Sequence, residues 1–426
     1  MSNIDNLVRQ AVFGNADEKD SAYRKIWDEA SENGTFSASI NDLYLARGRG
    51  ELPLDFTVPA INVRGMSYDF AQVVFKKAIE KKVAALIFEI ARSEMKYTGQ
   101  DPQEFVSCIL AAAVKSGYTG PVFIQGDHFQ LKPGEVAGQP KTDEIAKMKD
   151  LIKNSVTAGF YNIDLDASTL VDYSQNSVSD QQKSNYELTA ELAQFTRSLQ
   201  PEGIQVSLGA EIGHIGGKNS TVEELDAFME GFNKIYPKNL VGLSKISIQT
   251  GTHHGGVVLP DGTLAKVSVD FKTLKDLAKA SRKQKMAGTV QHGASTLPED
   301  FFNQFPRSEA VEVHLATEFQ NIIFNHPSFP KQLLDKMYVW IDQNLQKERK
   351  SGKTDQQFHY ELRKKAWGAF KKECWDLAQN LKEPILADLG KKFEFLFKEL
   401  NVENTQSMVN KIIKKECYVK KNHKGH

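Results

Sequence analysis

Three apolar runs typical of buried strands each lead to a histidine. The run Pro-Val-Phe-Ile-Gln-Gly ends in Asp127 and His128, and two later runs of the same kind lead to His254 and His292. Neutral imidazoles are preferred ligands of Zn²⁺, and three of them leave a coordination position for a substrate oxygen. Histidines at three strand ends therefore predict a catalytic site for a zinc-like ion, provided that the strands end at one edge of a sheet.

A carboxylate beside the first histidine offers acid–base chemistry. Neighbouring side chains in an extended strand point to opposite sides, so Asp127 need not bind the ion that His128 binds. We expect it to exchange a proton with a substrate, although a role as a hydrogen-bond partner of a histidine is the alternative. Asp166 and Glu211 end the two following strands. They could orient the histidine ligands, hold an alternative metal position or move a proton.

Small residues after the later histidines indicate an anion pocket. Gly255 and Gly293 leave backbone amides accessible, and Ser295 supplies a hydroxyl. Such amides and hydroxyls bind phosphate, and barrels often place phosphate sites after their last strands. Thr317 could complete this pocket.

The elements that must position these residues alternate between strands and helices. Short β-branched runs predict strands at 59–63, 84–90, 121–125, 162–167, 206–212, 245–250, 287–291 and 310–316. Amphipathic stretches predict helices at 69–82, 102–116, 142–158, 185–199 and 221–236, and a capping box from Ser220 to Glu223 begins the last of these. This alternation predicts an α/β protein in which eight parallel strands close a (β/α)8, or TIM, barrel. Functional residues are expected at the C-terminal strand ends, where Asn62 and His314 also lie.

Both ends of the chain lie outside the predicted barrel. We expect an N-terminal helical extension at 1–55, the catalytic barrel at 56–330 and a helical C-terminal extension at 331–426. Candidate helices in the two extensions are 20–30, 40–47, 331–349, 355–381, 384–400 and 405–417. The extensions are expected to pack on the barrel or to build a subunit interface, which favours a homo-oligomer, either a dimer or a tetramer.

Composition argues against several classes of protein. The 426 residues are 40% hydrophobic and 25% charged, as in an ordinary globular protein. No apolar segment is long enough to span a membrane and the N-terminus lacks a leader pattern, so we expect a cytoplasmic protein without a membrane partner. The net charge is zero, and the basic surplus after Lys331 reads as a solvated helical face, so no nucleic-acid partner is expected. The 3 cysteines lie far apart, which fits a reducing compartment without disulfides.

Six ordered blocks resemble the class II, metal-dependent ketose-bisphosphate aldolase family. The resemblance extends from Pro59 to Asn325. The blocks are PAINV at 59–63, GDH at 126–128, GFYNIDLDAS at 159–168, AEIGHIGG at 210–217, GTHHG at 251–255 and HGAS at 292–295.

The resemblance implies a metal-dependent aldol cleavage. It implies that His128, His254 and His292 hold a zinc ion, and that Asp127 exchanges the proton of the substrate's C4 hydroxyl. The metal would polarise the ketose carbonyl and stabilise the enediolate formed when the C3–C4 bond breaks. The expected substrate is a ketose 1,6-bisphosphate, first of all fructose 1,6-bisphosphate, which gives dihydroxyacetone phosphate and glyceraldehyde 3-phosphate.

The resemblance also implies roles for the residues around the ion. Asp166 and Glu211 take positions associated with an alternative metal site and with support of the ligands. Gly255, Gly293, Ser295 and Thr317 would bind the phosphate of the dihydroxyacetone phosphate half. The complete set of expected substrate-binding positions is Asn62, Gly255, Gly293, Ser295, His314 and Thr317.

Departures from the family pattern keep other functions open. Gln125 stands where the family usually has the first histidine of His-x-Asp-His, and His314 and Ala316 replace the asparagine and aspartate of the last strand. Ala91 stands in place of a serine. One alternative is therefore a C4 epimerase of a ketose phosphate or uronate that uses the same retro-aldol chemistry. Another is a non-catalytic subunit similar to those of tagatose-bisphosphate aldolases.

Overall fold

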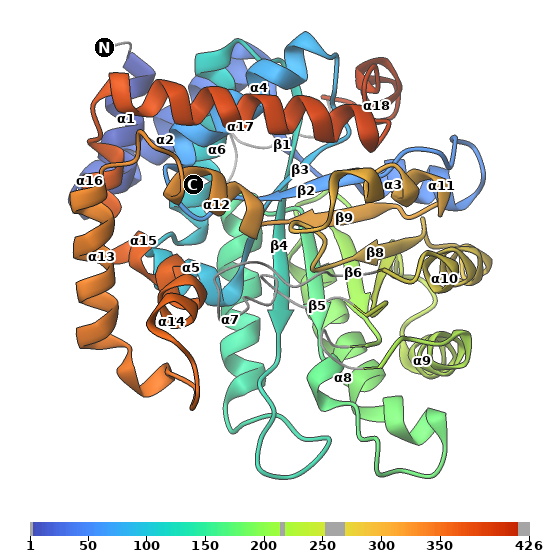
Figure 1. Ribbon diagram of the computed structural model, residues 1–426. Coiled ribbons are helices and arrows are strands. Elements are labelled where there is room, and N and C mark those ends of the chain that lie inside the picture. Colours follow the sequence, from blue (N-terminus) through green and yellow to red (C-terminus); the bar gives the residue numbers. More distant parts are fainter. Residues whose placement is uncertain (1–2, 214–217, 252–268, 416–426) are drawn as a thin grey trace.

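Eight parallel strands close into a barrel in the computed structural model, which describes residues 3–213, 218–251 and 269–415 (Figure 1). The strands of the barrel are β2 (Val58–Asn62), β3 (Ile87–Ala91), β4 (Gly120–Gln130), β5 (Asn162–Asp166), β6 (Ser207–Glu211), β7 (Lys245–Ile248), β8 (Thr289–Gln291) and β9 (Glu312–Leu315). Each strand pairs in parallel with the next one along the chain, and β9 pairs with β2 to complete the circle. The predicted TIM barrel is confirmed.

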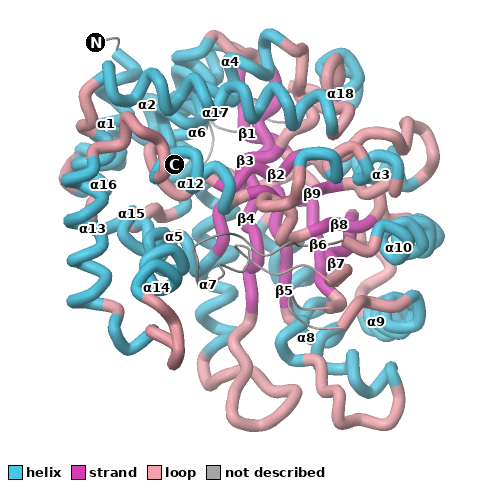
Figure 2. The backbone as a smooth tube through the Cα atoms, in the orientation of Figure 1, coloured by secondary structure: helices cyan, strands magenta, loops and turns pink. Residues whose placement is uncertain are grey.

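Helices surround the barrel (Figure 2). Those between or after its strands are α4 (Ser67–Glu80), α5 (Arg92–Thr98), α6 (Pro102–Ser116), α7 (Glu144–Ala158), α8 (Val178–Leu199), α9 (Val222–Ile235), α10 (Phe271–Lys283), α11 (Gln304–Arg307) and α12 (Thr317–Phe324), with short 3-10 turns η1 (Ser168–Leu170) and η2 (Glu299–Phe301). No helix in the described ranges is long and apolar enough to cross a membrane.

Local signals set the helix ends, with one correction to the prediction. Helix α6 has the predicted bounds because Asp101 caps its first turn and Gly117, at φ 70°, ends it in the left-handed conformation. The capping box of α9 is formed by Thr221 and Glu224, one residue later than predicted. The reason is that Ser220 Oγ already accepts a hydrogen bond from the backbone N–H of Gln249 at 3.0 Å.

The N-terminal extension is mainly helical, as predicted, but it also contains a strand. Its elements are α1 (Asn3–Phe13), α2 (Ala16–Asn33), β1 (Thr35–Ala38) and α3 (Asn41–Gly48). Strand β4 is longer than its neighbours and pairs with β5 only from Gln125 onward. Strand β1 pairs with its first part, from Gly120 to Phe123. The extension thus supplies backbone partners where the barrel itself supplies none.

The C-terminal extension is helical but more broken than predicted. Its elements are α13 (Lys331–Asn344), η3 (Gln346–Glu348), α14 (Asp355–Leu362), η4 (Arg363–Lys365), α15 (Ala366–Ala369), α16 (Lys371–Trp375), α17 (Gln379–Glu399) and α18 (Gln406–Ile412). The single helix predicted over 355–381 is wrong. Four short helical pieces replace it because this part of the chain follows the barrel mouth, where α15 packs against α5.

A lysine is buried inside the barrel. The side chain of Lys245, on β7, is 1% exposed, and its ammonium lies 2.9 Å from Asp164 Oδ1 and 2.5 Å from Glu312 Oε1. It also donates to Gln125 Oε1 at 2.7 Å. Burial alone would lower the pKa of Lys245, but the two carboxylates raise it above its ordinary value. The ammonium therefore links β4, β5, β7 and β9 from within the barrel.

Removal of this ammonium should destabilise the fold. The substitution Lys245→Met leaves Asp164 and Glu312 buried without their cation, at a cost of about 3–5 kcal/mol in the free energy of unfolding. Urea denaturation followed by circular dichroism would measure this loss. The matched control is Lys272→Met, which removes a side chain that is 88% exposed and pairs with Asp276 on its own helix. Equal unfolding midpoints for the two variants would contradict the role of Lys245.

Candidate active site

A bulge in β4 brings Asp127 and His128 to the same side. The register between β4 and β5 shifts between Gly126 and Phe129, and His128 has a φ of 41°. A side chain at Gly126 would lie 2.4 Å from the ring of Phe129, so a glycine is needed there. The expectation that neighbouring side chains point to opposite sides is wrong at this point. Asp127 Oδ1 lies 3.9 Å from His128 Nε2.

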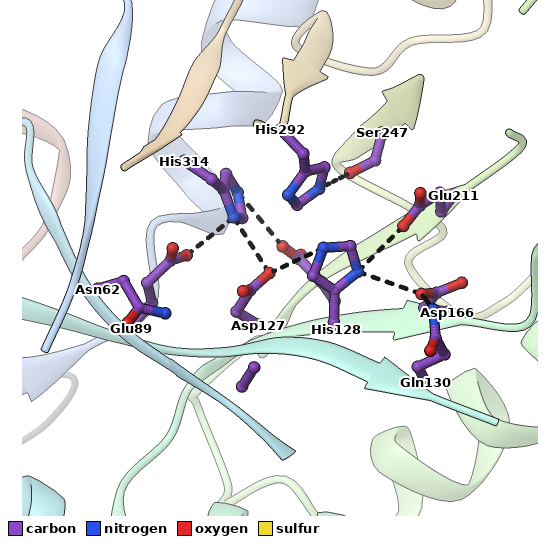
Figure 3. A network of polar contacts seen from close by, with 12 residues as sticks. Asn62, Glu89, Asp127, His128, Gln130, Asp166, Glu211, Ser247, His292 and His314 are labelled. Atoms are coloured by element: carbon purple, nitrogen blue, oxygen red, sulfur yellow. Dashed lines mark hydrogen bonds and ion pairs between the residues drawn. The ribbon is translucent and has the colours of Figure 1, made fainter. Parts of the chain in front are cut away.

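Two carboxylates hold the other nitrogen of His128 (Figure 3). Nδ1 lies 3.1 Å from Asp166 Oδ2, at the end of β5, and 3.2 Å from Glu211 Oε2, at the end of β6. Gln130 donates to the same Asp166 oxygen at 2.7 Å. Burial lowers the pKa of His128, but Asp127, Glu211 and Asp166 together raise it well above its ordinary value. Burial and the nearby Asp166 raise the pKa of Glu211 to about 8.

His292, after β8, lies against His128. Their ring centroids are 4.2 Å apart, and His292 Nε2 lies 3.1 Å from Ser247 Oγ on β7. Asp127, His128 and His292 each offer a ligand atom within 4.8 Å of the others. Imidazole nitrogens with a carboxylate oxygen are a donor set that suits a zinc-like ion. The other two positions expected beside this group, His254 and Gly255, lie outside the described residues.

Within the part of the chain that the structure describes, three further groups of acidic and histidine side chains could hold a metal, and they differ in how well they suit one. His128, Asp166 and Glu211 form a second position that shares His128 with the first. The group of Asp164, Glu312 and His314 already contains the ammonium of Lys245 at 2.5 Å from Glu312. A divalent cation there would be repelled by that charge. The third further group, Glu89, Asp127 and His314, shares Asp127 with the first position. The charge of Lys245 therefore argues against a metal only at the group of Asp164, Glu312 and His314.

His314 joins the buried lysine network to Asp127. Its Nδ1 lies 3.1 Å from Asp127 Oδ1 and 2.9 Å from Glu89 Oε2, and its Nε2 lies 2.6 Å from Glu312 Oε1. Burial lowers the pKa of His314, but Glu89 and Asp127 raise it well above its ordinary value. The residue predicted to contact substrate thus also orients Asp127.

The predicted anion-binding residues meet on the other side of the mouth. Gly293 follows His292, and Ser295 Oγ accepts a hydrogen bond from the backbone N–H of Thr317 at 3.1 Å. Thr317 is the first residue of α12, so the positive end of the helix dipole faces the same region. Gly293, Ser295 and Thr317 all line one cavity with His128 and His292.

Asn62 lines the cavity and contacts a second lining residue, Glu94, which was not predicted from the sequence. Its amide donates to Glu94 Oε2 at 2.6 Å, and Glu94 also pairs with Arg64 at 2.7 Å. Asn62, Glu94 and Arg64 line the cavity as well. Glu94 accepts a hydrogen bond from the backbone N–H of Ala91 at 2.8 Å, but alanine has no side-chain acceptor to complete a capping box, so no local pattern marked Glu94.

The cavity at the barrel mouth has a volume of about 1280 Å³. Carboxylates and histidines form its floor, whereas six cationic side chains of the described residues lie around it: Arg64, Arg92, Lys96, Lys132, Lys364 and Lys365. The C-terminal extension contributes part of the wall, through Trp340, Leu345 and the η4 residues. An acidic floor suits a cation, and a basic rim suits an anionic substrate.

These features define a (β/α)8 barrel protein with a metal-type cluster at the C-terminal ends of its strands. The sequence profile of the family described as Fructose-bisphosphate aldolase class-II matches residues 54–380. The chain belongs to this family, whose members typically use a metal. Membership of the family suggests lyase activity. The family match confirms the predicted resemblance.

Solved structures share the barrel at low identity. A fructose-bisphosphate aldolase from Campylobacter jejuni is 18% identical with a TM-score of 0.50, and the match covers 87% of this chain and 96% of that chain. A structure from Sinorhizobium meliloti 1021 described as a probable tagatose 6 phosphate kinase is 13% identical with a TM-score of 0.55, and covers 83% and 98% of the two chains. These likenesses show the fold alone. No curated protein matches the chain significantly.

Loss of one histidine ligand should lower the zinc content. We expect His292→Ala and His254→Ala each to reduce the zinc that co-purifies with the protein, as measured by plasma mass spectrometry. The control is His326→Ala, since His326 lies outside the cavity, 3.4 Å from Asp388. Full zinc occupancy in either site variant would remove that residue from the ligand set.

Zinc should bind more tightly as the pH rises. Glu211, with a pKa of about 8, and His128, whose pKa is raised, must both lose their protons before a cation binds beside them. The apparent dissociation constant should therefore fall between pH about 6 and about 8, and competition with a chromophoric chelator would measure it. The variant Glu211→Gln should show a weaker pH dependence. A dissociation constant that does not change with pH would contradict this assignment.

Proposed function

We propose that this chain is a zinc-dependent aldolase that reversibly cleaves a ketose 1,6-bisphosphate, with fructose 1,6-bisphosphate as the first candidate. The products are then dihydroxyacetone phosphate and glyceraldehyde 3-phosphate. The observation that carries the proposal is the group of Asp127, His128 and His292, within 4.8 Å of one another, in the cavity that Ser295 and Thr317 also line.

The first group of roles concerns the ion. His128, His292 and His254 are assigned as its ligands, and Asp166 and Glu211 hold His128 through its Nδ1. Carboxylates behind a histidine ligand fix its tautomer and increase its basicity. Lewis-acid polarisation of the ketose carbonyl is the chemistry that a bound zinc ion supplies.

The second group of roles concerns the substrate. Gly293, Ser295 and Thr317, with Gly255, are assigned to the phosphate next to the ketose carbonyl, since amides and hydroxyls at a helix N-terminus bind phosphate well. Asn62 is assigned to substrate hydroxyl groups at the opposite wall. These contacts hold the substrate with its C3–C4 bond above the floor of the cavity.

Asp127 is assigned the proton transfer. It takes the proton of the C4 hydroxyl as the C3–C4 bond breaks and the electron pair stays on C3, and it returns the proton in the condensation direction. His314 Nδ1, at 3.1 Å from Asp127 Oδ1, orients this carboxylate. In this role His314 is a positioning residue.

A coupled assay for triose phosphate release tests the proposal. Fructose 1,6-bisphosphate and tagatose 1,6-bisphosphate should be compared with and without a chelator, and cleavage should require the metal. The variant Asp127→Asn should lose about 10²- to 10⁴-fold in kcat while it retains zinc. The control is Asp276→Asn, on the outer helix α10. Activity that survives complete zinc removal, or full turnover in Asp127→Asn, would sink this function.

A C4 epimerase is a second candidate, because the C-terminal extension covers part of the cavity. Epimerisation by retro-aldol cleavage requires both fragments to stay in place until the bond forms again. His314, beside Asp127, offers a second titratable group near C4. Inversion at C4 without release of triose phosphate would favour the epimerase, and bound zinc with neither activity would favour a non-catalytic subunit.

A further inference from the structure

The C-terminal extension packs so closely against the barrel mouth that two of the contact positions, Gly65 and Gly368, have no room for a side chain. A side chain at Gly65, just after β2, would lie 2.2 Å from the ring of Trp367. A side chain at Gly368 would lie 2.2 Å from the backbone oxygen of Tyr97, on α5. Both positions must be glycine for α15 to come this close to the loops after β2 and β3. Trp367 is 2% exposed and stacks on Phe324 at 4.5 Å.

Arg363 fixes the same segment from the other side. Its guanidinium donates to Asn321 Oδ1 at 2.6 Å and to Asn325 Oδ1 at 2.7 Å, and the residue is 3% exposed. The backbone on both sides of Lys364 is therefore held by buried contacts with the barrel. Lys364 itself lines the cavity and is half-buried.

Half of the cations around the cavity are already neutralised. Arg64 pairs with Glu94 at 2.7 Å, and Arg92 pairs with Glu144 at 2.5 Å. Lys365 pairs with Glu348, also in the extension. The three paired cations have little electrostatic attraction left for a ligand.

The other three, Lys96, Lys132 and Lys364, form no ion pair with any residue in the described ranges. Lys96 and Lys132 are exposed, where water compensates their charge. Lys364 is half-buried, and the nearby carboxylates Glu94 and Glu348 are already paired with Arg64 and Lys365. A partly desolvated ammonium that has no ion pair of its own is costly unless an anion joins it.

We propose that Lys364 is the centre of a second phosphate subsite, which the C-terminal extension adds to the barrel and which selects substrates with a phosphate at the end away from the reacting carbonyl. This inference rests on the proposed function, since the first phosphate is assigned to Ser295 and Thr317. A volume of about 1280 Å³ exceeds the usual ligand pocket of about 300–1,000 Å³, so the cavity has room for a chain with an anion at each end. Lys96 and Lys132 then provide long-range attraction at the rim.

The position of the extension agrees with this role. Helix α15 packs on α5, and α5 follows β3 directly and contacts β4, the strand that carries Asp127 and His128 (Figure 1). Ser295 and Thr317 come instead from the ends of β8 and β9. The two anion positions thus belong to different sectors of the barrel mouth, with the metal-type cluster on its floor.

Binding of two simple phosphates tests the subsite without relying on turnover. The probes are 1,6-hexanediol bisphosphate and hexyl phosphate, titrated by calorimetry into the zinc-loaded full chain. The wild type should bind the bisphosphate more tightly than the monophosphate. The substitution Lys364→Gln should weaken bisphosphate binding by about ten- to a hundredfold and leave hexyl phosphate within about twofold. The control is Lys347→Gln, an exposed lysine of the extension that does not line the cavity.

The pH dependence adds a second readout. Burial and the charge of Arg64 lower the pKa of Lys364 to about 8, while Glu94 and Glu348 oppose this shift. Lys364 is charged below that pH and neutral above it, so the preference for the bisphosphate should fade above pH 8. The substitution Lys364→Arg should restore the preference at higher pH, because arginine stays charged.

The outcomes separate this inference from the proposed function. A bisphosphate preference that depends on Lys364 supports the subsite even if no ketose is cleaved. Equal binding of the two probes by the wild type, no binding of either, or an unchanged preference in Lys364→Gln would overturn it even if the chain is an active aldolase. Circular dichroism of each variant would show that the fold is retained.

Discussion

The ammonium of Lys245 is the interaction on which the interior of this barrel depends. Most barrel interiors are layers of branched apolar side chains, but here Asp164, Glu312 and Gln125 fill part of the space. Without the ammonium the carboxylates of Asp164 and Glu312 would repel each other in a medium of low polarity. With it, Glu312 is held in place to contact His314, and His314 to contact Asp127. The orientation of Asp127, the proposed proton-transfer group, therefore depends on Lys245 through Glu312 and His314.

One cavity combines two opposite electrostatic environments. On its floor, carboxylates surround His128 and raise its pKa, which is the environment that attracts a cation. At its rim, lysines and arginines attract anions, and two of them, Arg64 and Arg92, are neutralised by Glu94 and Glu144. A cation and an anion are therefore each favoured in a different part of the same cavity.

The sequence predicted the barrel because strand periodicity and helix caps are local signals. It also brought His128 and His292 together correctly, since eight closed strands leave only one mouth at which their ends meet. It did not predict the bulge at Gly126, because the register shift there depends on the pairing of β4 with β5, which lies far along the chain. The alternation of Lys245 with Ser247, and of Glu312 with His314, was a usable signal of a polar barrel interior. Strand β1 and the wall formed by Lys364 involve partners far apart along the chain, and no local pattern reveals such pairings.

The cavity wall that Trp367 and Gly368 hold against the barrel is synthesised after the barrel itself. All eight barrel strands end before Lys331, but the wall around Lys364 follows them in the sequence. During synthesis the barrel can close while its cavity is still open on the side of α5. Helix α17 packs on α4, with the ring centroids of Phe393 and Phe70 5.3 Å apart. Helix α17 follows the wall in the sequence and is synthesised later still. Apolar surface on α4 therefore stays accessible to other chains until α17 has been made, and aggregation is a risk during that interval.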